Sequence, residues 1–304
     1  MKLLDTMKLL DTMKLQITTV LAAAALLGGL TACNNELDQP QADQVPENAV
    51  RITASISNPF AATRSMPLGT AEEQGKFKEG DEIFVRFTNS QDHTTYRFDG
   101  TVWTPKDGKY LLWWSSPMDF SAHYPVEWGL YLSVPSASPY AHPSDQSTKE
   151  KIAKADRMQG LLFGVEKTKE PLRFEMKRQM ARLIVEIAGF KSEFPADAKV
   201  ENVRFLLKKD PAGPQLEYIP YTEDEGKKGS TYTVLVPYNA IHNKISLEVG
   251  GKTMTAELSE DLYVLRKSYT YHLTVGKEKL EVGEVTVADW TGSATIPGGE
   301  AKGD

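Results

Sequence analysis

Residues 269–275 read YTYHLTV, and in this stretch apolar and polar side chains alternate strictly. A period of two is typical of a β-strand with one buried face. The same alternation occurs at residues 83–87, 203–207 and 245–249. Turn-forming residues separate such runs, at positions 99–100, 107–108, 211–214 and 250–251. Many short strands with frequent turns predict an all-β fold built from β-sandwiches.

The length of 304 residues allows one large domain or two ordinary ones. An aromatic-rich half and a proline-rich loop precede Glu170 and Pro171, and a new series of strands begins at Leu172. We therefore predict an N-terminal β-sandwich domain at residues 51–170. A C-terminal β-sandwich domain follows at residues 171–304 and ends in a terminal strand segment.

One short helix is expected between the strands. Ser147 and Glu150 have the Ser-x-x-Glu spacing of a capping box, and helix-forming residues continue to Arg157. Because the stretch is short, it is predicted to form little more than a surface turn. Residues 130–147 contain three prolines and are predicted to be a loop.

The first 32 residues are predicted to be a signal peptide. The hexapeptide MKLLDT at residues 1–6 repeats at residues 7–12, so we take Met13 as the true start. An apolar run then extends from Ile17 to Leu30. A basic start followed by a short apolar run is typical of secretory signals, whereas a membrane-spanning helix needs roughly 20 apolar residues.

Cys33 is the only cysteine of the chain, and it directly follows Leu30-Thr31-Ala32. This tetrad resembles a bacterial lipobox, which implies cleavage between Ala32 and Cys33 and lipidation, such as palmitoylation, of the Cys33 thiol. The alternative is a buried free cysteine. Residues 33–50 are polar and contain no aromatic side chain, so we expect a flexible lipoprotein tether there.

The charge of the chain argues against nucleic acid as a partner. The net charge is −6; residues 1–32 carry three lysines and two aspartates, so the chain from Cys33 onward carries −7. Such a mildly acidic chain lacks the basic footprint of nucleic-acid binding. A single cysteine also excludes a disulfide within the chain.

No motif for catalysis, cofactor binding or metal binding stands out. The five histidines, at positions 93, 123, 142, 242 and 272, do not have metal-ligand spacing, and His272 lies on the polar face of its strand pattern. There is neither a Gly-x-Ser-x-Gly elbow nor a phosphate-binding loop. We therefore expect no enzyme, no cofactor and no metal.

An aromatic cluster is the one feature that suggests a ligand. Aromatic side chains stack on sugars, but they also fill β-sandwich cores, and we expect most of these to be core. The adjacent Trp113 and Trp114 must point to opposite faces of a regular strand. The cluster consists of Trp103, Tyr110, Trp113, Trp114, Tyr124 and Trp128.

Several segments resemble the fimbrillin family of Bacteroidetes, the type V pilins. They are KEGDEI at 78–83, WT at 103–104 with the aromatic run 110–114, FSAHYP at 120–125, residues 174–187, and residues 271–275 running to Asp289 and Trp290. The resemblance implies two transthyretin-like Greek-key β-sandwich domains in tandem. It also implies export as a lipoprotein of the cell outer membrane and surface assembly into a fimbrium. The implied partners are other pilin subunits, joined head to tail, and glycans or proteins of host or bacterial surfaces.

Polymerising subunits of that family are cut after a basic residue. The matching bond here lies between Arg64 and Ser65, within AATRS at residues 61–65, where the flanking side chains are small. The alternative is an ordinary exposed arginine. Residues 50–56 alternate like a strand, so a cut would remove a strand and expose an apolar groove.

The end of the chain has two possible fates. Leu280 and Val282 share one parity, Val285 and Val287 share the other, and Gly283 lies between them, as a β-bulge or bend requires. These pieces either pair within their own sandwich, or the piece with Val285 and Val287 is donated to a neighbouring subunit by strand addition.

Three functions follow for testing. The first is a fimbrial subunit or a fimbria-associated adhesin. The second is a monomeric glycan-binding surface lipoprotein, and the third is a cell-surface hydrolase, for which no positive sequence feature was found.

Overall fold

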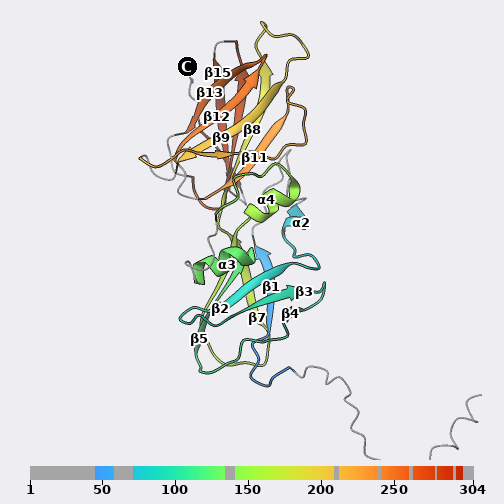
Figure 1. The fold of residues 1–304 in the computed structure, drawn as a ribbon, viewed down its shortest axis with the longest axis vertical. Coiled ribbons are helices and arrows are strands. Elements are labelled where there is room, and N and C mark those ends of the chain that lie inside the picture. The colour runs from blue at the N-terminus through green and yellow to red at the C-terminus, as the bar shows by residue number, and fades with distance from the viewer. Residues whose placement is uncertain are drawn as a thin grey trace, which may run out of the picture. The chain divides into compact units, whose positions relative to one another are not determined.

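The computed structural model describes residues 45–57, 71–133, 141–208, 212–237, 241–259, 263–277, 279–289 and 292–296 (Figure 1). Residues 1–44, and with them the predicted signal peptide and most of the predicted tether, lie outside this description. The described strands form three sheets, so the predicted all-β fold is confirmed. We call β1 to β7 with their helices the N-terminal lobe, and β8 to β16 the C-terminal lobe.

The N-terminal lobe is built on a single seven-stranded sheet with the order β1-β7-β6-β5-β2-β3-β4. The first and last strands of this order are its edges, and β1 pairs with β7 in parallel, whereas the other pairs are antiparallel. The strands are β1 (Ile52–Ser57), β2 (Glu82–Phe87), β3 (His93–Phe98), β4 (Trp103–Pro105), β5 (Met118–Tyr124), β6 (Met158–Val165) and β7 (Leu172–Arg178).

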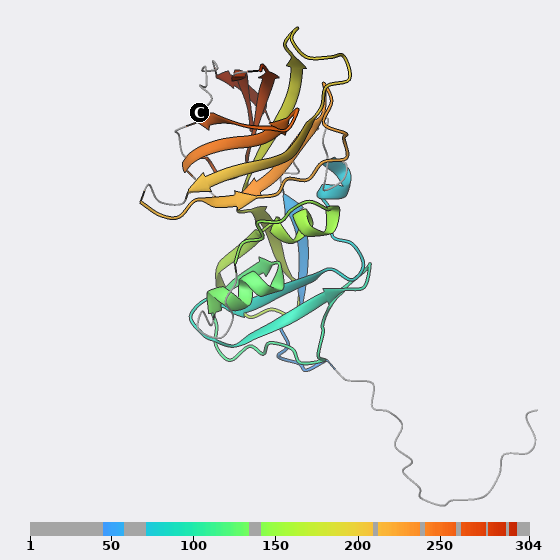
Figure 2. The same cartoon turned by 45° about the horizontal axis from the view of Figure 1, so that its top comes forward.

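The C-terminal lobe is a sandwich of two sheets. One sheet contains β9 (Val200–Lys208), β10 (Leu216–Tyr218), β12 (Ile241–Val249) and β13 (Lys252–Ser259) in the order β10-β9-β12-β13. The other contains β8 (Ala181–Phe190), β11 (Thr231–Val236), β14 (Lys267–Val275), β15 (Leu280–Asp289) and β16 (Gly292–Ile296) in the order β11-β8-β14-β15-β16. The strands of both sheets can be followed in Figure 2. Apolar side chains from both sheets, such as Phe205 and Leu273, share one core.

The predicted alternation holds in the C-terminal lobe but fails at one point in β2. In β14, Tyr269, Tyr271, Leu273 and Val275 are buried and the residues between them are half-exposed. In β2, however, Phe84 is buried although it belongs to the opposite face from Ile83 and Val85. Helix α3 (Val126–Ser133) covers that face, and a Cβ on its Gly129 would lie 2.6 Å from the Phe84 ring. The last residues of this helix, 130–133, fall in the region 130–147 predicted to be a loop, so that prediction is wrong at its start.

The predicted boundary at Glu170 and Pro171 lies one strand too early. Strand β7 begins at Leu172 but pairs with β1 and β6, so it belongs to the N-terminal sheet. The sheets change between Arg178 and Ala181. Pro171 therefore lies in the connection between two strands of one sheet, where turn residues are as common as at a domain boundary. The Greek-key, transthyretin-like connectivity of each domain stays a prediction.

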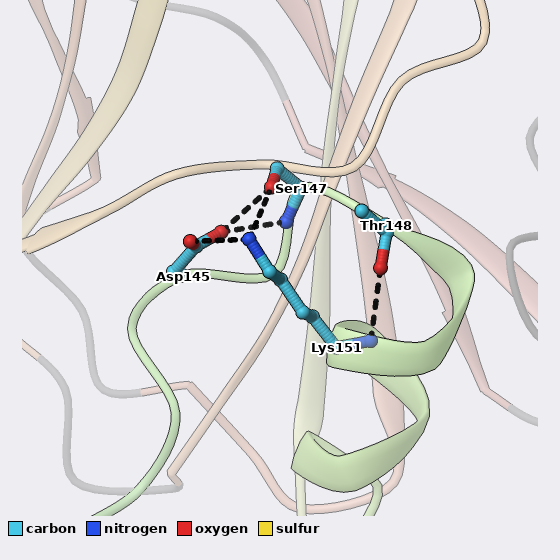
Figure 3. Close-up of polar contacts among 4 residues, drawn as sticks. All are labelled: Asp145, Ser147, Thr148 and Lys151. Carbon is cyan, nitrogen blue, oxygen red and sulfur yellow. Dashed lines mark hydrogen bonds and ion pairs between the residues drawn. The ribbon is translucent and has the colours of Figure 1, made fainter.

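The predicted short helix is present as α4 (Lys149–Ala155), but its cap differs by one residue. The Thr148 side chain, not that of Ser147, accepts the hydrogen bond from the Lys151 amide at 3.3 Å (Figure 3). Ser147 instead donates its hydroxyl to Asp145 at 2.7 Å. The helix is more than a surface turn, because it buries Ile152 and Ala155 against the C-terminal lobe residues Met180, Tyr221 and Leu235. A four-residue helix, α2 (Ala71–Gln74), precedes β2.

Candidate assembly site at the first strand

Strand β1 is one of the two edge strands of the N-terminal sheet, and it is also part of the core. Ile52 is 4% exposed, and Ala54 and Ile56 pack against the same cluster from half-buried positions. On the neighbouring β7, Leu172, Phe174 and Met176 are buried in that cluster. The apolar side chains of β1 therefore lie beside the buried row on β7. Without β1, strand β7 would become the edge of the sheet.

Main-chain hydrogen bonds tie β1 to the lobe from two sides. In the parallel pair, the Leu172 amide donates to the Arg51 carbonyl at 2.8 Å. Just before β1, the Val50 amide donates to the Leu111 carbonyl and the Trp113 amide donates to the Asn48 carbonyl, both at 2.8 Å. The hydroxyl of Tyr96 donates to the Val50 carbonyl at 2.6 Å. The segment is thus held chiefly by backbone bonds, which any extended chain can replace.

The predicted cleavage and lipidation residues are Ala32, Cys33, Arg64 and Ser65, and all four lie outside the described residues. By sequence, Arg64 and Ser65 fall between the end of β1 at Ser57 and the start of α2 at Ala71. A cut after Arg64 would separate β1 from the rest of the sheet without breaking any described strand. This position in the sequence fits the predicted maturation step.

The C-terminal candidates Val285 and Val287 lie in β15, between β14 and β16. They are 8% and 6% exposed and belong to the core of their own lobe. The register shifts by one residue at Gly283, because Tyr271 lies opposite Val285 while Leu273 lies opposite Val282. The predicted bulge is therefore confirmed, and it turns the side chains on both of its sides, Leu280 and Val282 as well as Val285 and Val287, into the core.

The aromatic cluster divides into buried and exposed members, although Trp113 and Trp114 lie outside the described strands. Trp113 is 4% exposed and packs against Phe120, whereas Trp114 is 68% exposed and makes a T-shaped contact with Phe87 at a centroid distance of 6.3 Å. Trp103 and Trp128 are buried, and Tyr110 and Tyr124 are half-buried. Most of the cluster is therefore core, and Trp114 is its exposed member.

The histidines do not converge. His272 is half-exposed beside Glu186 at 3.5 Å, as its place on the polar strand face predicts. His123, in contrast, is buried beneath α3 against Trp128. Within the described ranges, no group of three His, Cys, Asp or Glu side chains is arranged to hold a metal ion. The same part of the chain contains no helix that is both long and apolar enough to cross a membrane.

These features define a class: an all-β protein with one seven-stranded sheet in its N-terminal lobe, edged by β1, and two packed sheets in its C-terminal lobe. The chain belongs to the fimbrillin-like family, whose model matches residues 68–290. The resemblance seen in the sequence is thereby confirmed. The matched range begins after β1 and after Arg64.

The chain is similar to several solved structures. A candidate cell adhesion protein from Bacteroides uniformis matches with a TM-score of 0.52 and 17% identity, covering 80% of this chain and 98% of that one. The tip fimbrial protein Mfa3 from Porphyromonas gingivalis matches with a TM-score of 0.41 and 13% identity, covering 69% and 93%. The fimbrial anchor protein Mfa2 from the same organism matches with a TM-score of 0.42 and 8% identity, covering 83% and 99%. A comparison with curated proteins finds no match.

Proposed function

We propose that this chain is a surface lipoprotein that serves as a fimbrial subunit or as a fimbria-associated adhesin. The observation that carries the proposal is the family match over residues 68–290. In this proposal Cys33 carries the lipid that holds the chain at the outer membrane.

The edge position of β1 supports a route to assembly. Proteolysis after Arg64 would release β1 together with the lipid anchor, and the buried row on β7 would then need a new covering strand. A strand from a neighbouring subunit supplies both the lost backbone hydrogen bonds and apolar side chains at alternate positions. A contact of this kind is head to tail, so it extends a filament instead of closing a dimer.

Limited trypsin treatment of the purified protein, followed by electron microscopy, tests this route. We expect filaments from the wild type and from Arg51→Ala, which removes a different exposed arginine. Arg64→Ala should resist the cut and stay monomeric. Filaments from uncut Arg64→Ala would rule out this maturation step, and an absence of filaments from cleaved wild-type protein would argue against a polymerising subunit.

A second function is favoured by one observation, the exposure of Trp114. An indole face in water is a stacking platform for a sugar ring, as in a monomeric glycan-binding lipoprotein. Replacing Trp114 with Ala should then reduce retention on a glycan column without changing the unfolding midpoint. Equal retention of both proteins would remove the support that this residue gives.

A further inference from the structure

A pocket of about 150 Å³ opens in the N-terminal lobe where α2, β5 and β7 come together. At about 30 Å³ per water, this is room for roughly five waters. Its apolar lining includes Ile56, Phe77 and Met158. The Phe77 ring is fixed by edge contacts with Trp103 at 5.0 Å and with Tyr124 at 6.3 Å. The pocket thus has a firm apolar wall with an aromatic member.

The inner end of the pocket is charged and rigid. The Nε atom of Arg178 donates to both carboxylate oxygens of Asp156, at 3.0 and 2.8 Å. The Nη2 atom of Arg178 donates to the Gln74 carbonyl at 3.1 Å. Arg178 is 2% exposed and Asp156 is 5% exposed. Because these contacts already hold the ion pair in place, a ligand meets a preorganised polar surface.

Asp81 and Tyr124 also line the pocket, and each can form a further hydrogen bond. One oxygen of Asp81 accepts from the Lys78 amide at 2.7 Å. In the part of the chain that the structure describes, its other oxygen and the Tyr124 hydroxyl have no hydrogen-bond partner. Burial, followed by the negative charges of Asp81 and Asp156, raises the pKa of Tyr124, so its hydroxyl stays a donor at neutral pH. One hydrogen-bond donor and one acceptor therefore line the same pocket.

The charges around the pocket select against ions. Three acids line it, Glu73, Asp81 and Asp156, and three bases, Lys76, Lys78 and Arg178. With the two signs balanced, neither an anion nor a cation gains a net attraction. A hydroxyl group suits the pair of Asp81 and Tyr124, because it donates one hydrogen bond and accepts another. The apolar wall adds a surface for C–H groups.

We propose that this pocket binds one neutral sugar ring, with a ring hydroxyl donating to Asp81 and accepting from Tyr124. A pyranose combines hydroxyls along its edge with an apolar C–H face, and the latter packs on the side of the pocket formed by Phe77 and Met158. The site is separate from Trp114, but its wall includes Ile56 of β1. The proposal therefore concerns the uncut chain, in which β1 is paired with β7.

Binding of simple glycosides to the full chain tests the proposal. The probes are the methyl glycosides of glucose, galactose, mannose and N-acetylglucosamine, measured at millimolar concentration by saturation-transfer NMR. We expect at least one of them to bind, and the loss of one hydrogen bond in Asp81→Asn or Tyr124→Phe should weaken it by about tenfold. Asparagine keeps an oxygen for the Lys78 amide, so the turn at Asp81 should survive.

Matched variants outside the pocket serve as controls. Asp92→Asn removes a carboxylate from an exposed turn, and Tyr110→Phe removes a hydroxyl from another half-buried tyrosine. Both should bind the glycoside as the wild type does. The proposal is overturned if no glycoside binds, or if Asp81→Asn and Tyr124→Phe, with unchanged melting curves, bind as tightly as the controls.

Discussion

The guanidinium of Arg178 and the carboxylate of Asp156 form a buried ion pair, with Nε 2.8 Å from the nearer oxygen and side-chain exposures of 2% and 6%. Arg178 ends β7, the last strand of the N-terminal sheet, and Asp156 directly follows α4. Burying either charge alone would carry a large desolvation penalty, and the attraction between the two charges offsets this penalty. The contact therefore fixes the end of α4 against the strand that leads into the C-terminal lobe.

Asp156→Ala should lower the free energy of unfolding by about 3–5 kcal/mol, because it leaves the Arg178 charge buried without its carboxylate. Urea unfolding followed by circular dichroism measures this change. Glu72→Ala, which breaks the exposed pair with Lys76, should leave the midpoint unchanged. Adding Arg178→Met to Asp156→Ala should recover part of the loss. Equal midpoints for Asp156→Ala and Glu72→Ala would contradict this account of the pair.

His123 should make stability fall as the pH drops below neutrality. Burial beneath α3, and after it the charge of Arg86, lowers the pKa of His123 from 6.5 to about 4. The unfolded chain therefore binds a proton that the folded chain excludes. The contribution of His123 to the free energy of unfolding is complete above pH 6.5, its pKa in the unfolded chain. This contribution is lost as the pH falls towards about 4, its pKa in the folded protein.

By this linkage, His123 should account for a loss of about 2 kcal/mol between about pH 7 and about pH 5. Carboxylates also titrate at low pH, so the measurement is the difference between wild type and His123→Phe in urea unfolding at both pH values. His93→Gln, at an exposed histidine, is the control and should follow the wild type. A pH dependence of His123→Phe that equals the wild type would disprove the effect.

The predictions that came true were those that depend on local periodicity. The alternation of side chains located the strands. The change of parity between Val282 and Val285 located the bulge at Gly283. With one extra residue between them, the side chains on both sides of a bulge share a face. The different exposure of Trp113 and Trp114 agrees with the expectation that they point to opposite sides, although the segment that holds them is not a strand. These features need no knowledge of which strands are neighbours.

The features that were missed depend on contacts between distant segments. Phe84 and His123 are buried only because α3 covers their face, and eight residues are too few for a reliable helical period. The membership of β7 in the first sheet depends on its parallel pairing with β1, more than 100 positions away along the chain. The candidate pocket likewise draws Asp81, Asp156 and Arg178 from three separate elements, and no spacing in the sequence brings them together.

Cys33 should be the site of lipidation. Growth with radiolabelled palmitate should label the wild type and leave Cys33→Ala unlabelled, since no other thiol exists in the chain. Each buried CH₂ of an acyl chain contributes roughly 0.8 kcal/mol, so Cys33→Ala should also move from the membrane fraction to the soluble fraction. Equal labelling of the two proteins would show that the lipobox resemblance is misleading.

Val285 and Val287 should be required for the fold of the chain itself. In β15 they lie opposite Tyr271 and Tyr269 of β14, and β16 pairs along the other side of the same strand. An aspartate at either position would place a negative charge among the apolar side chains of the core shared by the two sheets. The cost of burying an unpaired charge is at least several kcal/mol, comparable with the whole stability of a domain.

The double variant Val285→Asp, Val287→Asp should therefore lose its cooperative thermal transition, measured by circular dichroism. Thr286→Asp is the matched control, because Thr286 lies between the two valines in β15 and is half-exposed, and this variant should melt as the wild type does. A double variant that instead stays folded as a monomer, and fails only to enter filaments, would show that this segment is donated to a neighbour. In that case the pairing of β15 with β14 would describe the free subunit alone, because the same valines would fill a neighbour's groove after assembly.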